Sequence, residues 1–231
     1  MAIIHRTTLT PTKLELLTAW LPGRPWYRGG AGEPRLARAG GFRLDDPEGE
    51  VGIEFMVATD TAGPEPVHYL APLTYRGAPL DGAEHALIGT TEHGVLGTRW
   101  VYDGCHDPVL VTELLALFEG RAQAQAQGLT DTPDHEIVRS CTGSAPLPPA
   151  PAAPFAEDDK GGEDDKGGED DEDATSIAVA PGLTLRLHRV LRPAPDAVAD
   201  RPEGTLGHVA GHWDLPDGDR ARAVFAVLHG G

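Results

Sequence analysis

The 231-residue chain has no asparagine, only two cysteines, and no apolar run close to the ~20 residues that a membrane-spanning helix needs. Two cysteines are too few for a disulfide scaffold, so we expect Cys105 and Cys141 to be free thiols. The N-terminus shows no signal-peptide pattern. These features together predict a cytoplasmic protein. Lysine is also scarce, because Lys13 is the only one outside an acidic run.

Negative charge is concentrated in one segment. The net charge is -17, and residues 157–173 contribute -9 of it through eleven acidic side chains and two lysines. This segment contains the hexapeptide Glu-Asp-Asp-Lys-Gly-Gly twice and no apolar residue, so we expect it to be disordered. The remaining charge of -8 is ordinary for a globular domain. Nucleic acid and anionic membranes are therefore not expected partners, because both need a basic surface.

The N-terminal segment predicts an amphipathic helix. Thr10 is the expected N-cap residue and Pro11 the first helical residue, where a missing N–H has no cost. Pro22-Gly23 is expected to end the helix. The apolar stripe consists of Leu14, Leu17, Trp20 and Leu21. A helix of about three turns is not stable alone in water, so this stripe must pack on another element.

The same segment carries a family resemblance. The sequence Trp20-Leu-Pro-Gly-Arg-Pro-Trp26-Tyr27 resembles the Trp-Leu-Pro-x-x-x-Trp-Phe signature of the N-terminal cap of bacterial maltokinases and related glucosamine kinases. Residues 102–108, Tyr-Asp-Gly-Cys-His-Asp-Pro, are similar to the segment that leads those caps into their next helix. The resemblance covers about residues 1–140. It implies a curved, cystatin-like antiparallel sheet around a helix.

The rest of the chain predicts strands and one more helix. Asp107-Pro108 begins a helix that should run to about Arg121. Residues 28–42 look like a loop, 81–91 like a turn or short helix, and 122–127 like a frayed helix end. Strands are expected at about residues 50–59, 67–75, 94–103, 183–191, 207–215 and 220–228.

These elements predict an α+β fold. We expect a single curved antiparallel sheet of about six strands, with two main helices packed on one face. Residues 1–140 would form the cap-like region, and residues 141–176 a Pro-rich and acidic linker. Residues 177–231 would supply C-terminal strands that complete the same sheet.

The motifs of kinase and metal chemistry are missing or incomplete. Kinases of the resembled family need His-x-Asp-x-x-x-x-Asn, and the nearest match is His212-Trp-Asp214, with Asp219 in place of the asparagine. The chain has no Walker A sequence and no Gly-x-Ser-x-Gly elbow. His208 and His212 have the spacing of a zincin helix but lack its glutamate. We therefore predict no catalytic residue, no metal site and no cofactor.

Two groups of side chains are candidates for binding. The first is aromatic and could form either a sugar-stacking platform or part of the core. It comprises Trp20, Trp26, Tyr27, Trp100 and Tyr102. The second is His85 with His93, which could be surface histidines or could join a carboxylate in a general-base site.

Three functions remain open at this level. The resemblance implies a non-catalytic, maltokinase-cap-like module of bacterial glycogen, trehalose and maltose-phosphate metabolism that binds a partner protein or a sugar metabolite. One alternative is a small hydrolase or sugar-converting enzyme with a His/carboxylate site in the concavity of the sheet. Another is a cap supplied in trans to a separate sugar kinase.

Overall fold

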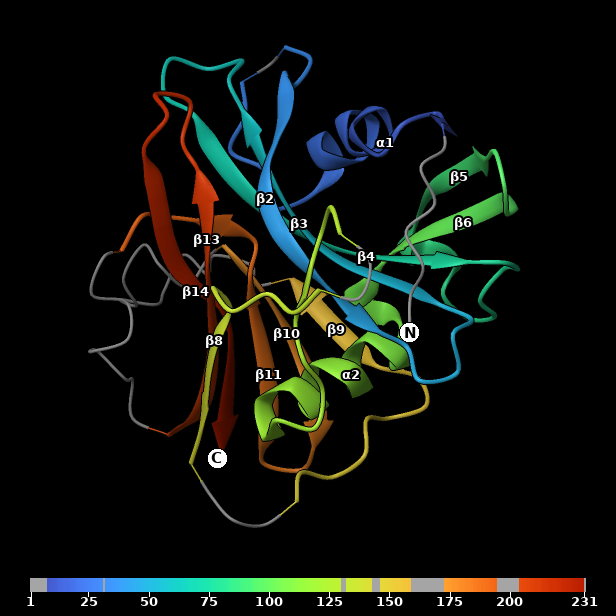
Figure 1. Cartoon of the computed structure of the whole chain (residues 1–231), viewed down its shortest axis with the longest axis vertical. Coiled ribbons are helices and arrows are strands. Elements are labelled where there is room, and N and C mark those ends of the chain that lie inside the picture. The colour runs from blue at the N-terminus through green and yellow to red at the C-terminus, as the bar shows by residue number, and fades with distance from the viewer. Residues whose placement is uncertain are drawn as a thin grey trace.

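The computed structural model describes residues 8–30, 32–129, 132–142, 146–158, 173–194 and 204–230. Strands dominate this part of the chain (Figure 1). The described residues form two α-helices, α1 (Lys13–Trp20) and α2 (Pro108–Glu119), and three short 3-10 helices, η1 (Leu21–Gly23), η2 (Glu84–Ala86) and η3 (Gly104–His106). The strands are β1 (Leu9–Thr10), β2 (Leu36–Asp45), β3 (Gly52–Asp60), β4 (Val67–Arg76), β5 (Leu87–His93), β6 (Gly97–Asp103), β7 (Gln125–Ala126), β8 (Val138–Cys141), β9 (Phe155–Asp158), β10 (Ala174–Ala180), β11 (Leu183–His188), β12 (Val190–Leu191), β13 (Thr205–Asp214) and β14 (Arg220–Gly230).

All fourteen strands belong to one antiparallel sheet with the order β1-β5-β6-β4-β3-β2-β13-β14-β11-β10-β9, and with β7, β8 and β12 attached beside it. The link between β2 and β13 is a single residue pair, Gly40 with Trp213. We call this meeting point the seam, and the strands on either side the N-terminal sheet (β1–β6) and the C-terminal sheet (β9–β11, β13 and β14). The expectation of an α+β fold with about six strands and two main helices is therefore wrong, because the described residues form mostly antiparallel sheet with only two short α-helices.

Helix α1 begins two residues later than expected. Its N-cap residue is Thr12, whose Oγ1 accepts a hydrogen bond from the backbone N–H of Glu15 at 3.2 Å, while the Glu15 carboxylate accepts one from Thr12 N at 2.7 Å. This reciprocal arrangement is a capping box. Thr10 instead belongs to β1 and pairs with Glu92.

Helix α2 begins as its sequence predicts. Asp107 is the N-cap and Pro108 the first residue, and the helix ends before Gly120, which has the left-handed φ of 77°. Its apolar side chains form one core with Phe42 and Phe55 of the N-terminal sheet and with Phe225 of the C-terminal sheet.

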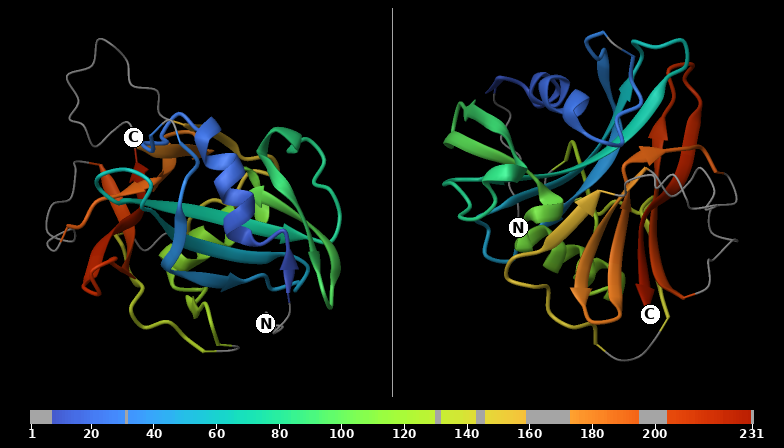
Figure 2. Two further views of the ribbon diagram at one scale, coloured as in Figure 1. Left: turned by 90° about the horizontal axis from the view of Figure 1, so that it is seen from above. Right: turned by 180° about the vertical axis from the view of Figure 1, so that it is seen from behind.

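The two helices lie on opposite faces of the N-terminal sheet, which corrects the expectation of one face. Met56 of β3 packs with Leu17 of α1 and with Leu21 of η1. The preceding residue of β3, Phe55, packs instead in the core that contains α2. Successive side chains of a strand point to opposite faces, so β3 contributes to both cores. Seen from above, α1 crosses in front of the strands while α2 lies behind them (Figure 2).

The sequence also did not predict several of the strands. Among them are β2, which begins in the expected loop 28–42, β5, which begins in the expected turn or short helix 81–91, and β7, which lies in the expected frayed helix end 122–127. In β2 the glycines have a structural reason. A Cβ on Gly40 would lie 3.2 Å from Trp213 Cα, and Gly41 has a φ of 121° that side chains rarely adopt.

The acidic repeat lies largely outside the described residues, which resume at Asp173. Within the expected linker 141–176, residues 155–158 form β9 and residues 174–176 belong to β10. The proposed division of the chain at residues 140 and 176 stays a prediction. Both cysteines are free, as expected. Neither helix of the described part has the length and apolar character that crossing a bilayer requires.

Candidate functional site

Three of the aromatic candidates lie together in one cluster, in which Trp20 and Tyr27 are half-buried. Trp26 is fully buried and contacts the Trp20 ring at 5.7 Å and the Tyr69 ring at 5.9 Å between centroids. Tyr27 stacks on Tyr69 at 5.8 Å and donates a hydrogen bond from its hydroxyl to Asp60. A sugar-stacking platform needs an open aromatic face, and Trp26 has none.

The other two aromatics lie in a separate small cluster. Trp100 and Tyr102 of β6 pack with Leu80, Ala83 and Ala86. The buried Tyr102 hydroxyl accepts a hydrogen bond from Leu80 N at 2.9 Å. The five aromatic candidates therefore do not share one surface.

The two candidate histidines flank opposite ends of β5. Nε2 of His85 lies 3.1 Å from Nδ1 of His106, with the two rings nearly perpendicular. Nδ1 of His93 accepts hydrogen bonds from the backbone N–H groups of Val95 and Leu96 in the β5–β6 turn. His93 thus stabilises a hairpin turn. Within the described ranges, no three histidine, cysteine or acidic side chains are placed to hold a metal ion.

A buried ionic group joins the N-terminal and C-terminal sheets. Arg189 is fully buried and donates hydrogen bonds to both carboxylate oxygens of Asp103, at 2.9 and 2.7 Å, and to Thr175 Oγ1 at 2.6 Å. Burial alone would lower the pKa of Arg189, but the Asp103 carboxylate raises it, so the guanidinium stays charged.

The neighbouring thiol is not an activated nucleophile. Cys105 is fully buried, and its Sγ lies 3.0 Å from a guanidinium nitrogen of Arg189. Burial raises the pKa of Cys105 well above its usual value even though the positive charge of Arg189 opposes this change. A nucleophilic cysteine needs the thiolate form, so this group is structural.

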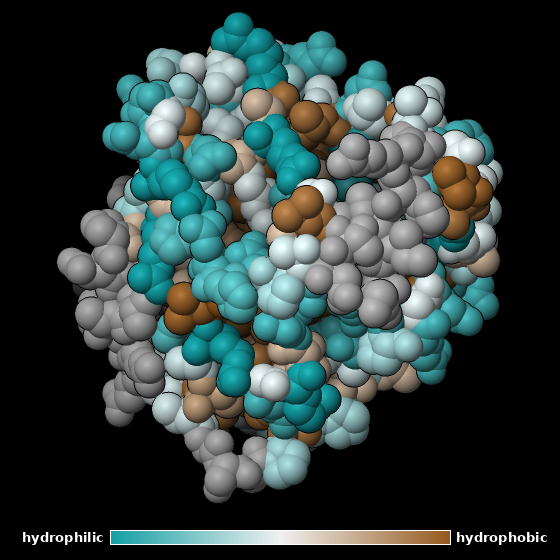
Figure 3. All heavy atoms as spheres, in the orientation of Figure 1, coloured by the Kyte–Doolittle hydropathy of each residue, from teal (hydrophilic) through white to brown (hydrophobic). Residues whose placement is uncertain are grey.

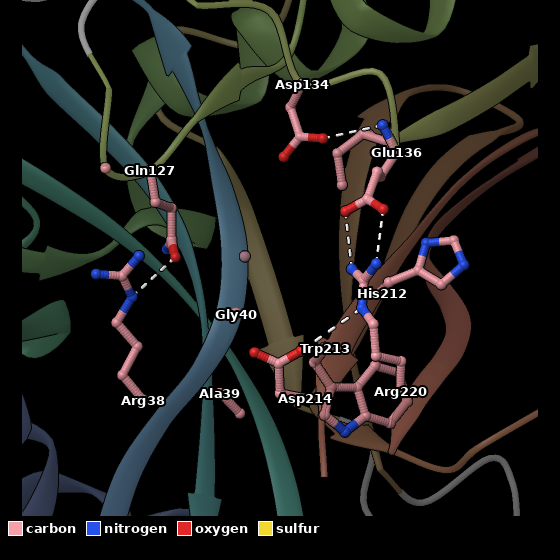
Figure 4. A pocket seen from close by; sticks show the side chains of 13 residues that line it. Arg38, Ala39, Gly40, Gln127, Asp134, Glu136, His212, Trp213, Asp214 and Arg220 are labelled. Atoms are coloured by element: carbon pink, nitrogen blue, oxygen red, sulfur yellow. Dashed lines mark hydrogen bonds and ion pairs between the residues drawn. The ribbon is translucent and has the colours of Figure 1, made fainter. Parts of the chain in front are cut away.

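A polar hollow of about 180 Å³ opens at the seam (Figure 4). It forms because β2 and β13 meet only at Gly40 and Trp213. Beyond that pair, β13 continues alongside β8 and β2 alongside β7. The polar side chains of its wall are Arg38, Gln127, Asp134, Glu136, His212, Asp214 and Arg220.

The charged groups of the polar hollow are partly paired with each other. The guanidinium of Arg220 donates to both carboxylate oxygens of Glu136 at 2.7 Å and lies 3.5 Å from Asp214. The hydrogen bonds from Arg220 lower the pKa of Glu136. On the opposite wall, Nε of Arg38 donates to Oε1 of Gln127 at 3.0 Å.

Sequence reasoning missed this site. His212 and Asp214 appeared in a fragment of a kinase motif, His212 also in an incomplete zincin spacing, and Arg38 lay in an expected loop. The wall combines residues more than 170 positions apart, and only the pairing of β2 with β13 brings them together. Neither the expected loop at residues 28–42 nor the expected hairpin at 207–228 carries a local pattern that indicates a binding site.

A second hollow, of about 450 Å³, has mainly apolar walls that include Val67, Val190 and Leu191. The buried His68 is part of it, with Nδ1 2.8 Å from Thr59 Oγ1 and its ring 5.4 Å from that of Trp213. Burial lowers the pKa of His68.

The comparisons with known proteins concern the N-terminal sheet. Residues 20–107 match the family model of the maltokinase N-terminal cap domain. This range runs from the last residue of α1 to the N-cap of α2. No curated protein matches the chain. The resemblance inferred from residues 20–27 and 102–108 is confirmed.

Proposed function

We propose, starting from a maltokinase-cap-like module at residues 20–107, that this chain is a non-catalytic binding protein of carbohydrate metabolism. It would act in the cytoplasm of a bacterium, in glycogen, trehalose or maltose-phosphate metabolism, by docking on a partner protein. The family match is the observation that carries this proposal. The self-paired charges of the polar hollow agree with a binding role, because they form no nucleophile–base pair.

The β5–β6 hairpin is the best candidate for the docking surface. Large exposed apolar side chains are few among the described residues, and three of the five belong to this hairpin: Leu87, Val95 and Leu96. Val95 and Leu96 are 62% and 46% exposed. The face of the molecule in Figure 3 is mainly hydrophilic, with apolar residues in separate small patches. Because Val95 and Leu96 are already partly buried, covering the rest of each side chain would contribute about half of the ~1.5–3 kcal/mol that a fully exposed residue gains.

The test is co-purification with the full-length tagged chain. We expect the wild type to capture an enzyme of carbohydrate metabolism and the Val95→Asp/Leu96→Asp variant to lose it. Leu129→Asp is the matched control, because Leu129 is 56% exposed and lies outside the matched range. If all three chains captured the same proteins, the β5–β6 hairpin would not be the docking surface. If no enzyme of carbohydrate metabolism co-purified with the wild type, the proposed function would be wrong.

A cap supplied in trans is the most specific form of this proposal. Adding the purified chain to a sugar kinase that lacks its own cap would then change the rate of sugar phosphorylation. An unchanged rate would contradict the proposal of a cap supplied in trans. A His/carboxylate enzyme has less support. Helix α2 packs in one core with both sheets, and His85 lies in η2 before β5 whereas His93 is the last residue of β5.

A further inference from the structure

Several polar atoms around the polar hollow have unused hydrogen-bonding capacity within the described part of the chain. Arg38 uses only its Nε, so its two Nη groups can donate. Asp134 accepts one backbone hydrogen bond through Oδ1, and Asp214 has one ion pair at 3.5 Å. Nδ1 of His212 is buried and has no partner among these residues. The hollow therefore offers both donors and acceptors.

The charge of the wall argues against a strongly charged ligand. Two arginines and three carboxylates line the hollow, and Arg220 is already paired with Glu136. A phosphate dianion would face the carboxylates of Asp134 and Asp214, and a metal cation would compete with both arginines. A neutral ligand avoids both repulsions.

Size and polarity restrict the ligand further. A volume of about 180 Å³ equals that of about six waters at ~30 Å³ each, and drug-sized ligands usually occupy larger pockets of about 300–1,000 Å³. The large aromatic side chain of the wall, Trp213, is 1% exposed and offers no stacking face. The ligand must therefore be small and must bind through hydrogen bonds.

We propose that the polar hollow binds one ring of a neutral polyhydroxylated compound, that is, a single sugar unit. Each hydroxyl both donates and accepts a hydrogen bond, which suits the alternation of guanidinium, carboxylate and imidazole groups in the wall. The ring would bridge Arg38 on β2 and Asp214 on β13, across the seam where one residue pair joins the strands. Binding would therefore fasten the N-terminal sheet to the C-terminal sheet.

The experiment is a calorimetric titration of the full chain with D-glucose, maltose and trehalose. The choice of these probes rests on the proposed function. Glucose 6-phosphate tests the effect of added negative charge, and cyclohexanol tests a ring with a single hydroxyl. The variant Arg38→Gln/Asp214→Asn removes one group from each wall. Its control is Arg35→Gln/Asp217→Asn, which makes the same changes at two residues that do not line the hollow.

We expect at least one of the three sugars to bind with saturation below about 10 mM, where a site with a Kd of about 1 mM is nine-tenths filled. The Arg38→Gln/Asp214→Asn variant should bind at least about tenfold more weakly, and the control should match the wild type. The sugar phosphate and cyclohexanol should bind more weakly than the sugar. Bound sugar should also raise the Tm of the wild type.

Absence of saturable binding of all three sugars would overturn the inference, as would equal affinity in the variant and the wild type. Tighter binding of glucose 6-phosphate would show an anion site instead. Thermal unfolding of each variant without ligand establishes that it is folded. Co-purification of a partner through the β5–β6 hairpin does not depend on the hollow, so the two proposals can fail separately.

Discussion

The two sheets differ in how their faces are covered. In the N-terminal sheet, β3 and β4 are buried almost continuously, because α1 covers one face and α2 the other. In the C-terminal sheet, β11 alternates between buried and half-buried residues, because only one of its faces packs on α2. The polar side chains of the hollow lie where these two differently covered sheets meet.

The largest effect should come from the core between α1 and the N-terminal sheet. Replacing the fully buried Trp26 by alanine should lower the free energy of unfolding by about 3–5 kcal/mol, because a large cavity is left. Trp20→Ala should lower the free energy of unfolding by less, because Trp20 is only half-buried. Urea unfolding measures both. If Trp26→Ala kept wild-type stability, Trp26 would be an accessible residue and the binding platform would again be viable.

The ion pairs of the two regions offer a second contrast. Asp103→Asn leaves the charge of buried Arg189 without its carboxylate, and we expect a loss of about 3 kcal/mol in the free energy of unfolding. Glu136→Gln breaks the exposed pair with Arg220, which should cost no more than about 1 kcal/mol.

Denaturant unfolding of both variants, with the double variant Asp103→Leu/Arg189→Met, gives the comparison. The double variant removes both charges and should recover much of the loss. Equal losses for Asp103→Asn and Glu136→Gln would show that the buried pair does not join the sheets.

The parts of the fold that the sequence predicted have strong local signals. Asp107-Pro108 begins α2, and the alternating leucines at 183, 185 and 187 form β11, as expected. The β3 and β4 strands also lie within two residues of their expected bounds. Each of these segments carries its own cap or its own apolar period.

The missed features depend on contacts distant in the chain. The glycines at 40 and 41 resemble a loop signal, but they allow β2 to approach Trp213 and Phe55. No local pattern could indicate that β13 would lie there. The same long-range pairing creates the polar hollow, so the error in β2 and the missed site have one cause. Arg189 is a similar case, because its buried partner Asp103 is 86 residues away.

The start of α1 allows a smaller test of local reasoning. Thr12→Ala removes the side-chain acceptor of the capping box and should destabilise the chain by about 1 kcal/mol. Thr10→Ala changes the residue that the sequence suggested as the cap and should have a smaller effect. Thermal unfolding compares the two. A larger loss for Thr10→Ala would place the helix start at the residue first expected.

The smallest effect concerns pH and the apolar hollow beside Trp213. Burial lowers the pKa of His68 below the ~6.5 of an unfolded chain, so the unfolded state takes up a proton first as the pH falls. The stability linked to His68 is therefore complete above about pH 6.5 and is lost as the pH falls toward the folded-state pKa. One proton can contribute at most about 1.4 kcal/mol per pH unit.

His68→Asn keeps a polar atom near Thr59 Oγ1 but does not titrate. Between about pH 7.5 and pH 5, the free energy of unfolding of this variant should fall less than that of the wild type. Urea unfolding at several pH values measures the two slopes, and the same comparison with the turn residue His93 replaced by asparagine is the control. Identical slopes for wild type and His68→Asn would mean that His68 is protonated equally in both states. Solvent would then reach the imidazole as readily in the folded protein as in the unfolded chain, and the apolar walls of this hollow would not shield His68.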